Sequence, residues 1–214
     1  MGARAVIFDF NGTLSEDEPL LAEIFSRLFA EHGKPLSREK YFERFAGLSD
    51  PEIVRTWLGR DHPAVGAVIE ERIARYRAAV ADGSSIPDEA REAVRYAASR
   101  VPVALVSGAA REEIEPVLAA AGIGYLFSAI VAADDVEHGK PHPQGYERAL
   151  ELLDGDLAPG DVVVFEDTEA GVAAAKAAGM RCIATLGTLA PERLAKADEL
   201  VERIDLGLVG RVLG

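Results

Sequence analysis

Ala5-Val6-Ile7-Phe8-Asp9-Phe10-Asn11-Gly12-Thr13-Leu14 is an apolar run that ends in a carboxylate, an amide, a glycine and a hydroxyl. The near-continuous apolar character of residues 5–8 is typical of a strand covered on both faces, as in parallel α/β sheets. The Asn-Gly pair permits the positive φ angles of a sharp turn. We therefore expect Asp9 at the carboxyl end of a buried strand, the edge where open α/β sheets bind ligands. An ordinary turn after a strand is the alternative, and this stretch alone does not decide between them.

The composition is that of an ordinary globular protein. The chain has 214 residues, of which 49% are hydrophobic and 28% charged, enough for one good core and a smaller second unit. Its formal net charge of -13 argues against broad binding to nucleic acid or an anionic membrane, because like charges repel. No run approaches the roughly 18 apolar residues of a membrane span, and no signal-type segment is present. We expect a cytoplasmic protein that is a monomer or a weak homodimer.

After Leu14 the pattern changes to helical periodicity for some seventy residues. Apolar residues at helical spacing predict a helix over 18–32, followed by helices over 37–45, 51–58 and 62–81. From Pro87 onward strands and helices alternate, which is the signature of a parallel sheet with crossover connections. The predicted fold is therefore α/β, with a Rossmann-like parallel sheet that carries helices on both faces and an inserted all-α unit.

The alternating part has strands predicted at 103–106, 129–132, 161–165, 181–185 and, weakly, 199–204. Helices are predicted at 88–99, 111–121, 143–153, 169–178, near 191–195 and at the end of the chain. Small and polar residues near 14–15 and 83–85 predict two hinges. The expected domains are an α/β core of residues 1–14 and 86–214, and a helical insertion of residues 15–85.

Polar side chains follow successive predicted strands. Asp9 follows the first, Ser107 the second, and Glu166 and Asp167 the strand at 161–165, while Lys140 lies in a loop after 129–132. Carboxylates are the ligands that Mg²⁺ prefers, and lysine and serine suit phosphate oxygens. Taken singly, Ser107 could belong to a plain turn and Asp167 could cap a helix. Because they fall together on successive loops at one sheet edge, a metal and phosphate site is favoured.

Four motifs in this order resemble those of the haloacid dehalogenase-like hydrolases, in the helical-cap subgroup of phosphatases and β-phosphoglucomutase-like enzymes. The motifs are the stretch from Asp9 to Leu14, Ser107-Gly108, Lys140-Pro141, and Phe165-Glu166-Asp167-Thr168 with Gly171. The resemblance covers essentially the whole chain. It identifies the helical insertion of residues 15–85 as the cap of such an enzyme.

The resemblance implies a phosphatase-like hydrolase of small phosphorylated metabolites. Asp9 would be the nucleophile that forms an aspartyl-phosphate, and Asn11 and Lys140 would complete the catalytic set. Phosphate would be bound by Ser107, Gly108 and Lys140. Mg²⁺ would be held by Asp9, the backbone carbonyl of Asn11, and Asp167, with Glu166 assisting.

Asn11 departs from the family pattern, in which phosphatases and mutases carry an aspartate that acts as acid and base. An amide cannot donate and recover a proton at neutral pH, and such help is worth roughly 10² to 10⁴-fold in rate. A sugar-phosphate mutase and a catalytically impaired phospho-ligand binder remain alternatives, whereas phosphonate-cleaving and dehalogenase activities fit less well. For substrate specificity, the sequence offers only candidate cap positions, namely Glu16, Arg44, Asp50 and Arg55.

Overall fold

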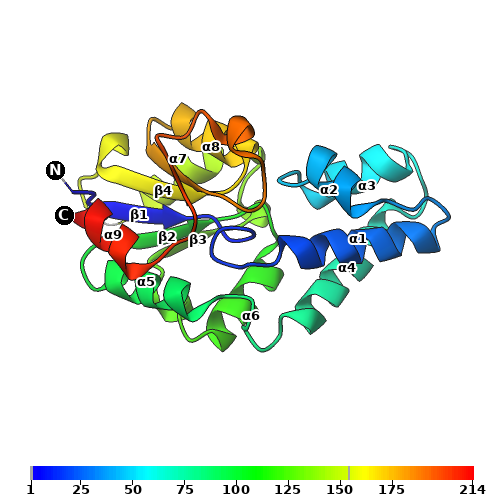
Figure 1. The fold of residues 1–214 in the computed structure, drawn as a ribbon, viewed down its shortest axis with the longest axis horizontal. Coiled ribbons are helices and arrows are strands. Elements are labelled where there is room, and N and C mark those ends of the chain that lie inside the picture. Colours follow the sequence, from blue (N-terminus) through cyan, green and yellow to red (C-terminus); the bar gives the residue numbers. More distant parts are fainter. Residues whose placement is uncertain (1, 154) are drawn as a thin grey trace.

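The computed structural model describes residues 2–153 and 155–214, and its centre is a six-stranded parallel sheet with the order β3-β2-β1-β4-β5-β6 (Figure 1). The strands are β1 (Ala5–Phe8), β2 (Val103–Val106), β3 (Ala129–Val131), β4 (Val162–Glu166), β5 (Arg181–Thr185) and β6 (Glu199–Val201). The chain adds β2 and β3 on one side of β1, then places β4 on the other side. This reversal between β1 and β4 leaves a crevice at their carboxyl ends, where ligands bind in such sheets.

The central strands are apolar because both faces of the sheet are covered. Every residue of β1, β2 and β4 is buried. Phe8 and Phe165 stack across neighbouring strands with their ring centroids 5.1 Å apart. Figure 1 shows α7 and α8 on one face and α5, α6 and α9 on the other. The α-helices are α1 (Glu18–Glu31), α2 (Arg38–Arg44), α3 (Asp50–Leu58), α4 (Val65–Ala79), α5 (Asp88–Ala98), α6 (Arg111–Ala120), α7 (Gln144–Leu152), α8 (Glu169–Ala177) and α9 (Leu206–Leu213).

The helices α1 to α4 lie together beyond one end of the sheet (Figure 1). Aromatic side chains pack between them, with the rings of Phe45 and Trp57 edge to face at 5.8 Å and those of Phe25 and Tyr41 stacked at 5.9 Å. The two segments that lead into and out of this unit are bonded to each other. Ser15 Oγ donates to Ser85 Oγ at 2.9 Å, and the Glu16 amide donates to the Ser85 carbonyl at 2.8 Å. The domain boundaries and the hinge motion stay predictions.

The predicted α/β fold is confirmed, and the differences concern element ends. The helix predicted from residue 62 begins at Val65, because His62 Nδ1 accepts from the Ala64 amide in a local turn. β4 extends through Glu166, which is therefore the last strand residue and not the first residue of the loop. The segment Pro191–Leu194 is a 3-10 helix. In the described part of the chain, no helix combines the length and apolar character needed to cross a membrane.

Candidate active site

Asp9 is the first residue beyond β1, and the residue is only 6% exposed. The turn after it is closed by the amides of Thr13, Leu14 and Ser15, which all donate to the Phe10 carbonyl. Gly12 has a φ of +72°, and a Cβ at this position would lie 2.0 Å from Asp167 Oδ2. Only glycine fits there, and its absence of a side chain lets the loops after β1 and β4 meet.

Lys140 connects three strand ends. Its Nζ donates to Asp9 Oδ1 at 2.5 Å, to Glu166 Oε1 at 2.5 Å and to the Val106 carbonyl at 3.2 Å. Burial alone would lower the pKa of the Lys140 ammonium, but the charges of Asp9 and Glu166 outweigh burial and raise this pKa. Lys140 therefore stays a cation among carboxylates.

Glu166 is fully buried, and both of its oxygens have partners. Oε1 also accepts from the Tyr146 hydroxyl at 2.9 Å. Oε2 accepts from the amides of Asp167 and Thr168 at 2.9 and 3.0 Å, and from Thr168 Oγ1 at 3.0 Å. Burial would raise the pKa of Glu166, but Lys140 and these donors lower it. The start of α8 fits closely over this carboxylate, because a Cβ on Gly171 would lie 1.8 Å from Glu166 Oε1.

Asp9, Glu166 and Asp167 form a cluster that fits a divalent cation. One oxygen from each lies within 4.8 Å of the others. Asp167 Oδ1 accepts from Thr13 Oγ1 at 3.0 Å, whereas the buried Asp167 Oδ2 has no hydrogen-bond partner. Burial and the neighbouring carboxylates raise the pKa of Asp167 well above its usual range, and burial raises that of Asp9 to about 7. A hard cation would neutralise this crowded negative charge and satisfy the unpartnered oxygen.

The Asn11 side chain is fixed by a residue that the sequence did not single out. Asn11 Nδ2 donates to Asp17 Oδ2 at 2.9 Å and to the Tyr76 hydroxyl at 3.3 Å. The Tyr76 hydroxyl in turn donates to Asp17, and the Gly12 amide donates to Asp17 Oδ1 at 3.3 Å. Asp17 is 1% exposed. The amide group of Asn11 is thus directed at a buried carboxylate.

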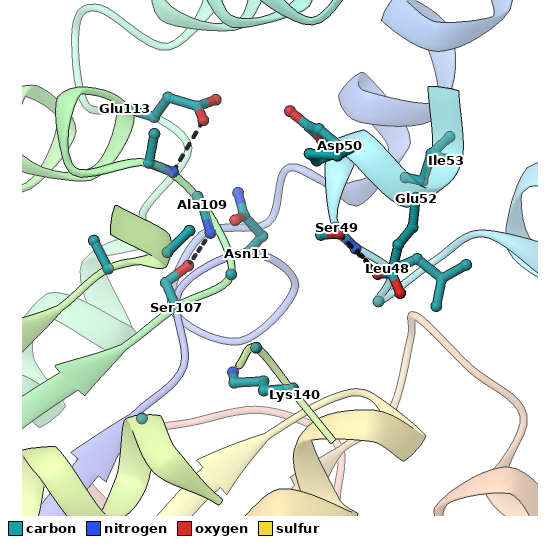
Figure 2. Close-up of a pocket in the computed structure, with 18 of the residues that line it drawn as sticks. Asn11, Leu48, Ser49, Asp50, Glu52, Ile53, Ser107, Ala109, Glu113 and Lys140 are labelled. Carbon is teal, nitrogen blue, oxygen red and sulfur yellow. Dashed lines mark hydrogen bonds between the residues drawn. The ribbon is translucent and has the colours of Figure 1, made fainter. Parts of the chain in front are cut away.

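The predicted phosphate-binding loop lies at the same cavity. Ser107 Oγ accepts from the Ala109 amide at 3.1 Å (Figure 2). The cavity measures about 590 Å³, and its lining includes Asp9, Asn11, Ser107, Gly108 and Lys140. Glu166 and Asp167 lie behind this lining, next to Asp9 and Lys140. The structure therefore brings the predicted site residues together, while their roles stay predictions.

Cap residues form the opposite wall. Figure 2 shows the segment from Leu48 to Ile53 facing the core loops across the cavity. Of the suggested specificity positions, Asp50 lines the cavity. The other three positions, Glu16, Arg44 and Arg55, are exposed and do not line the cavity. Their elements turn these charged side chains to solvent.

Several polar residues of the cavity wall were not predicted from the sequence. Arg72 of α4 is bonded to Asp50 of the cap and, through both terminal nitrogens, to Glu113 of α6. The Tyr41 hydroxyl donates to Glu18 Oε2 at 3.2 Å. Burial and the nearby Asp17 charge raise the pKa of Glu18 to about 8. These residues could have been found as charged residues within the apolar stripe of a helix, because a charged side chain on a buried face needs a buried partner.

Comparison with known proteins gives consistent results. A family model described as haloacid dehalogenase-like hydrolase matches residues 3–179. The chain is 32% identical to validoxylamine A 7'-phosphate phosphatase of Streptomyces hygroscopicus subsp. limoneus, over 93% of each protein. It is 32% identical to phosphoglycolate phosphatase of Yersinia pestis, over 84% of this chain and 79% of that protein. The structure of CbbY from Rhodobacter sphaeroides in complex with phosphate superposes with a TM-score of 0.81 at 28% identity, covering 94% of this chain and 95% of that one.

Proposed function

This chain belongs to the haloacid dehalogenase-like hydrolases, and from that premise we propose a Mg²⁺-dependent phosphatase of small phosphorylated metabolites that works through Asp9. The observation that carries the proposal is the Asp9 carboxylate, bonded to Lys140 at 2.5 Å where both side chains line a cavity. Phosphatases among the relatives support the reaction class.

In the proposed reaction an Asp9 oxygen attacks phosphorus, and the bond from phosphorus to the leaving-group oxygen breaks. Water then attacks the aspartyl-phosphate, which releases phosphate and regenerates the carboxylate. Lys140 offsets the repulsion between the Asp9 carboxylate and the phosphate, since its ammonium already lies against Asp9 and Glu166. Ser107 and Gly108 lie in the loop after β2 on the same cavity and would hold phosphate oxygens.

The proposed Mg²⁺ ion would be held by Asp9, Asp167 and the backbone carbonyl of Asn11. Glu166 assists by holding Lys140 in place, because its own oxygens already accept from Lys140, Tyr146 and backbone amides. When bound, Mg²⁺ supplies positive charge that neutralises phosphate oxygens. The unpartnered Asp167 Oδ2 and the acidic cluster support this assignment.

Asn11 makes protonation of the leaving group the weak step of the proposed mechanism. Its amide carries no transferable proton at neutral pH, and its Nδ2 is committed to Asp17 and Tyr76. Aryl esters need no such proton and should react comparatively well. A second candidate function, favoured by Asn11, is binding of a phosphorylated ligand without turnover.

Hydrolysis of p-nitrophenyl phosphate with Mg²⁺ tests the proposal. We expect turnover by the natural chain, and a loss of roughly 10⁴-fold or more in Asp9→Asn, because the nucleophile is removed while the shape is kept. The exposed Asp88→Asn variant is the matched control and should keep full activity. Thermal melting verifies folding. Ligand-induced stabilisation without any turnover would favour the binding function, and full activity in folded Asp9→Asn would refute the role of Asp9.

The remaining expectations concern partners and location. We propose a small phosphorylated substrate, with no nucleic-acid or membrane partner, and a monomer or weak homodimer in the cytoplasm. The net charge of -13 supports the absence of a nucleic-acid or anionic membrane partner, because an acidic surface repels polyanions. Size-exclusion chromatography with light scattering measures the oligomeric state directly.

A further inference from the structure

The charge of the cavity wall restricts the group that can be attached to the phosphate. Apart from Asp9, the carboxylates in the lining are Glu18, Asp50, Glu52, Glu113, Asp134 and Glu137. Among the described residues that line the cavity, lysine and arginine side chains come only from Lys140 and Arg72. Glu18 is largely protonated at pH 7, because its pKa is about 8, but the other five carboxylates give the wall beyond the phosphate-binding loops an excess of negative charge.

Both of these cations are already occupied by carboxylates. Lys140 contacts Asp9 and Glu166, and it is the cation assigned to the reacting phosphate. Arg72, whose side chain is 5% exposed, contacts Asp50 and Glu113. Its terminal nitrogens face these two carboxylates, and its buried Nε has no partner. A second anionic group of a substrate would have to displace a buried carboxylate to reach a guanidinium.

The other nitrogen-bearing side chains in the lining do not reverse this balance. His138 and His142 are exposed in the loop around Lys140, with their rings 5.0 Å apart. His142 Nδ1 accepts from the Gln144 amide, and Glu137 and Asp134 belong to the same stretch of wall. Across the whole lining, carboxylates still outnumber the lysine, arginine and histidine side chains.

The wall does suit hydroxyl and ammonium groups. Carboxylate oxygens accept hydrogen bonds from both, and Asp50 and Glu52 lie on the cap segment that faces the core loops (Figure 2). A cavity of about 590 Å³ has room for a sugar-sized group beside the phosphate. Apolar side chains of Leu21, Phe25 and Ile53 complete the wall and can cover the faces of a ring.

We propose that the leaving group of the substrate is a neutral or cationic polyhydroxylated alcohol, such as a sugar, a cyclitol or an amino derivative of either. Esters whose leaving group carries a carboxylate or a second phosphate are then poor substrates. This inference rests on the proposed phosphatase function and adds the substrate class to it.

Three six-carbon phosphate esters of similar size, two from hexoses and one from a sugar acid, test the charge preference. Glucosamine 6-phosphate, glucose 6-phosphate and 6-phosphogluconate carry a cationic, a neutral and an anionic leaving group. With Mg²⁺ at pH 7, we expect kcat/KM for the first two to exceed that for 6-phosphogluconate by about tenfold or more, from charge repulsion at close range. Each ester is also measured as an inhibitor of p-nitrophenyl phosphate hydrolysis, so that a slow substrate still yields an affinity.

The variant Asp50→Asn tests whether the Asp50 carboxylate contributes to this charge preference. Asp50→Asn removes one carboxylate from Arg72. It should reduce the gap between glucosamine 6-phosphate and 6-phosphogluconate, measured as the ratio of their kcat/KM values, about tenfold. Asp88→Asn is the matched control, because Asp88 also begins a helix but is 89% exposed outside the cavity, and it should leave the gap unchanged. Melting curves verify folding, and the natural chain alone decides the charge preference if Asp50→Asn does not fold.

The outcomes separate the two proposals. If p-nitrophenyl phosphate is not hydrolysed, the phosphatase function fails and this inference falls with it. If it is hydrolysed but 6-phosphogluconate equals or exceeds the other esters in both kcat/KM and affinity, the phosphatase function stands and the substrate class is wrong. A preference for the cationic and neutral esters that Asp50→Asn weakens supports the inference.

Discussion

Lys140 and Arg72 are cations that each contact two carboxylates. Lys140 is half-buried at the edge of the sheet, and Arg72 is buried between the cap and α6. Lys140 meets Asp9 and Glu166, which come from the ends of β1 and β4. Arg72 of α4 meets Asp50 of α3 and Glu113 of α6. We call these groups the Lys140 centre and the Arg72 centre.

The centres differ in charge and in position. The Lys140 centre has a third carboxylate beside it, Asp167, with a buried oxygen that nothing satisfies. The Arg72 centre has no such addition among the described residues, and its guanidinium also lies over the rings of Phe25 and Tyr76 at 5.9 and 5.8 Å. The excess negative charge of the Lys140 centre fits the cation proposed above. The Arg72 centre connects the cap to the core.

Removal of each cation tests whether the two centres differ in their effect on turnover. Lys140→Met should lower p-nitrophenyl phosphate turnover by about 10³-fold, the scale of losing one preorganised charge at a reacting group. Arg72→Met should change turnover of this small ester less than about tenfold. Steady-state kinetics on both folded variants measures the difference. Equal losses would show that the two centres serve the same step.

The second prediction concerns stability. Arg72→Met leaves two carboxylates unpaired in a buried place and should lower the free energy of unfolding by about 3–5 kcal/mol. Urea unfolding measures it. Arg75→Met on the same helix is the control, because Arg75 pairs with Glu31 and Glu71 at the surface and should cost less than about 1 kcal/mol. Similar costs would contradict a structural role for the Arg72 centre.

Magnesium should distinguish the centres without any assay of activity. At a Mg²⁺ concentration about 100 times the Kd, binding should stabilise the natural chain by about 2.7 kcal/mol, seen as a raised Tm. Asp167→Asn should lose most of this shift, because it removes an oxygen assigned to the ion. Asp88→Asn should retain it. A shift that persists in Asp167→Asn would place the ion elsewhere.

A fourth test exchanges the groups at positions 11 and 17. Asn11→Asp alone sets a carboxylate against Asp17, whose Oδ2 lies 2.9 Å from Asn11 Nδ2. The double variant Asn11→Asp/Asp17→Asn restores one amide and one carboxylate. It should raise turnover of glucose 6-phosphate by roughly 10²-fold, the lower end of general acid-base help, and that of p-nitrophenyl phosphate less. An unchanged ratio between the two esters would mean that water or another residue supplies the proton.

Glu18 should make the stability of the protein depend on pH. Its pKa is about 8 in the folded protein because of burial and the Asp17 charge, against 4.5 for an ordinary glutamate. Between these values the folded state holds a proton that the unfolded state has lost, so stability falls as pH rises through this window. Glu18→Gln should therefore gain stability relative to the natural chain as pH rises from 5 to 8.

The gain is at most about 1.4 kcal/mol per pH unit, and below pH 4 it should vanish. Urea unfolding at several pH values measures it, with the exposed Glu16→Gln as the control for loss of a charge. A difference between Glu18→Gln and the natural chain that stays constant from pH 5 to 8 would show that Glu18 is ionised in the folded state over this range.

The fold class and the residues of the Lys140 centre could be predicted from the sequence. Buried parallel strands are continuous apolar runs, and the polar residues that end them, Asp9, Ser107 and Glu166, meet at one edge because parallel strands share a direction. Local rules act over a few residues, so the positions of these side chains could be predicted. The exact end of β4 could not, because Glu166 has strand geometry despite its charge.

Which charged side chains of the helices are buried could be seen only in the folded structure. Arg72 and Arg75 lie on one helix, yet Arg72 is buried against Asp50 and Glu113 while Arg75 stays at the surface. Asp17 likewise accepts from the hydroxyl of Tyr76, which is 59 residues away in the chain. Such contacts depend on how the helices pack in the folded protein. Helical periodicity predicts which face of a helix carries a side chain, but it does not predict the residue that this side chain contacts.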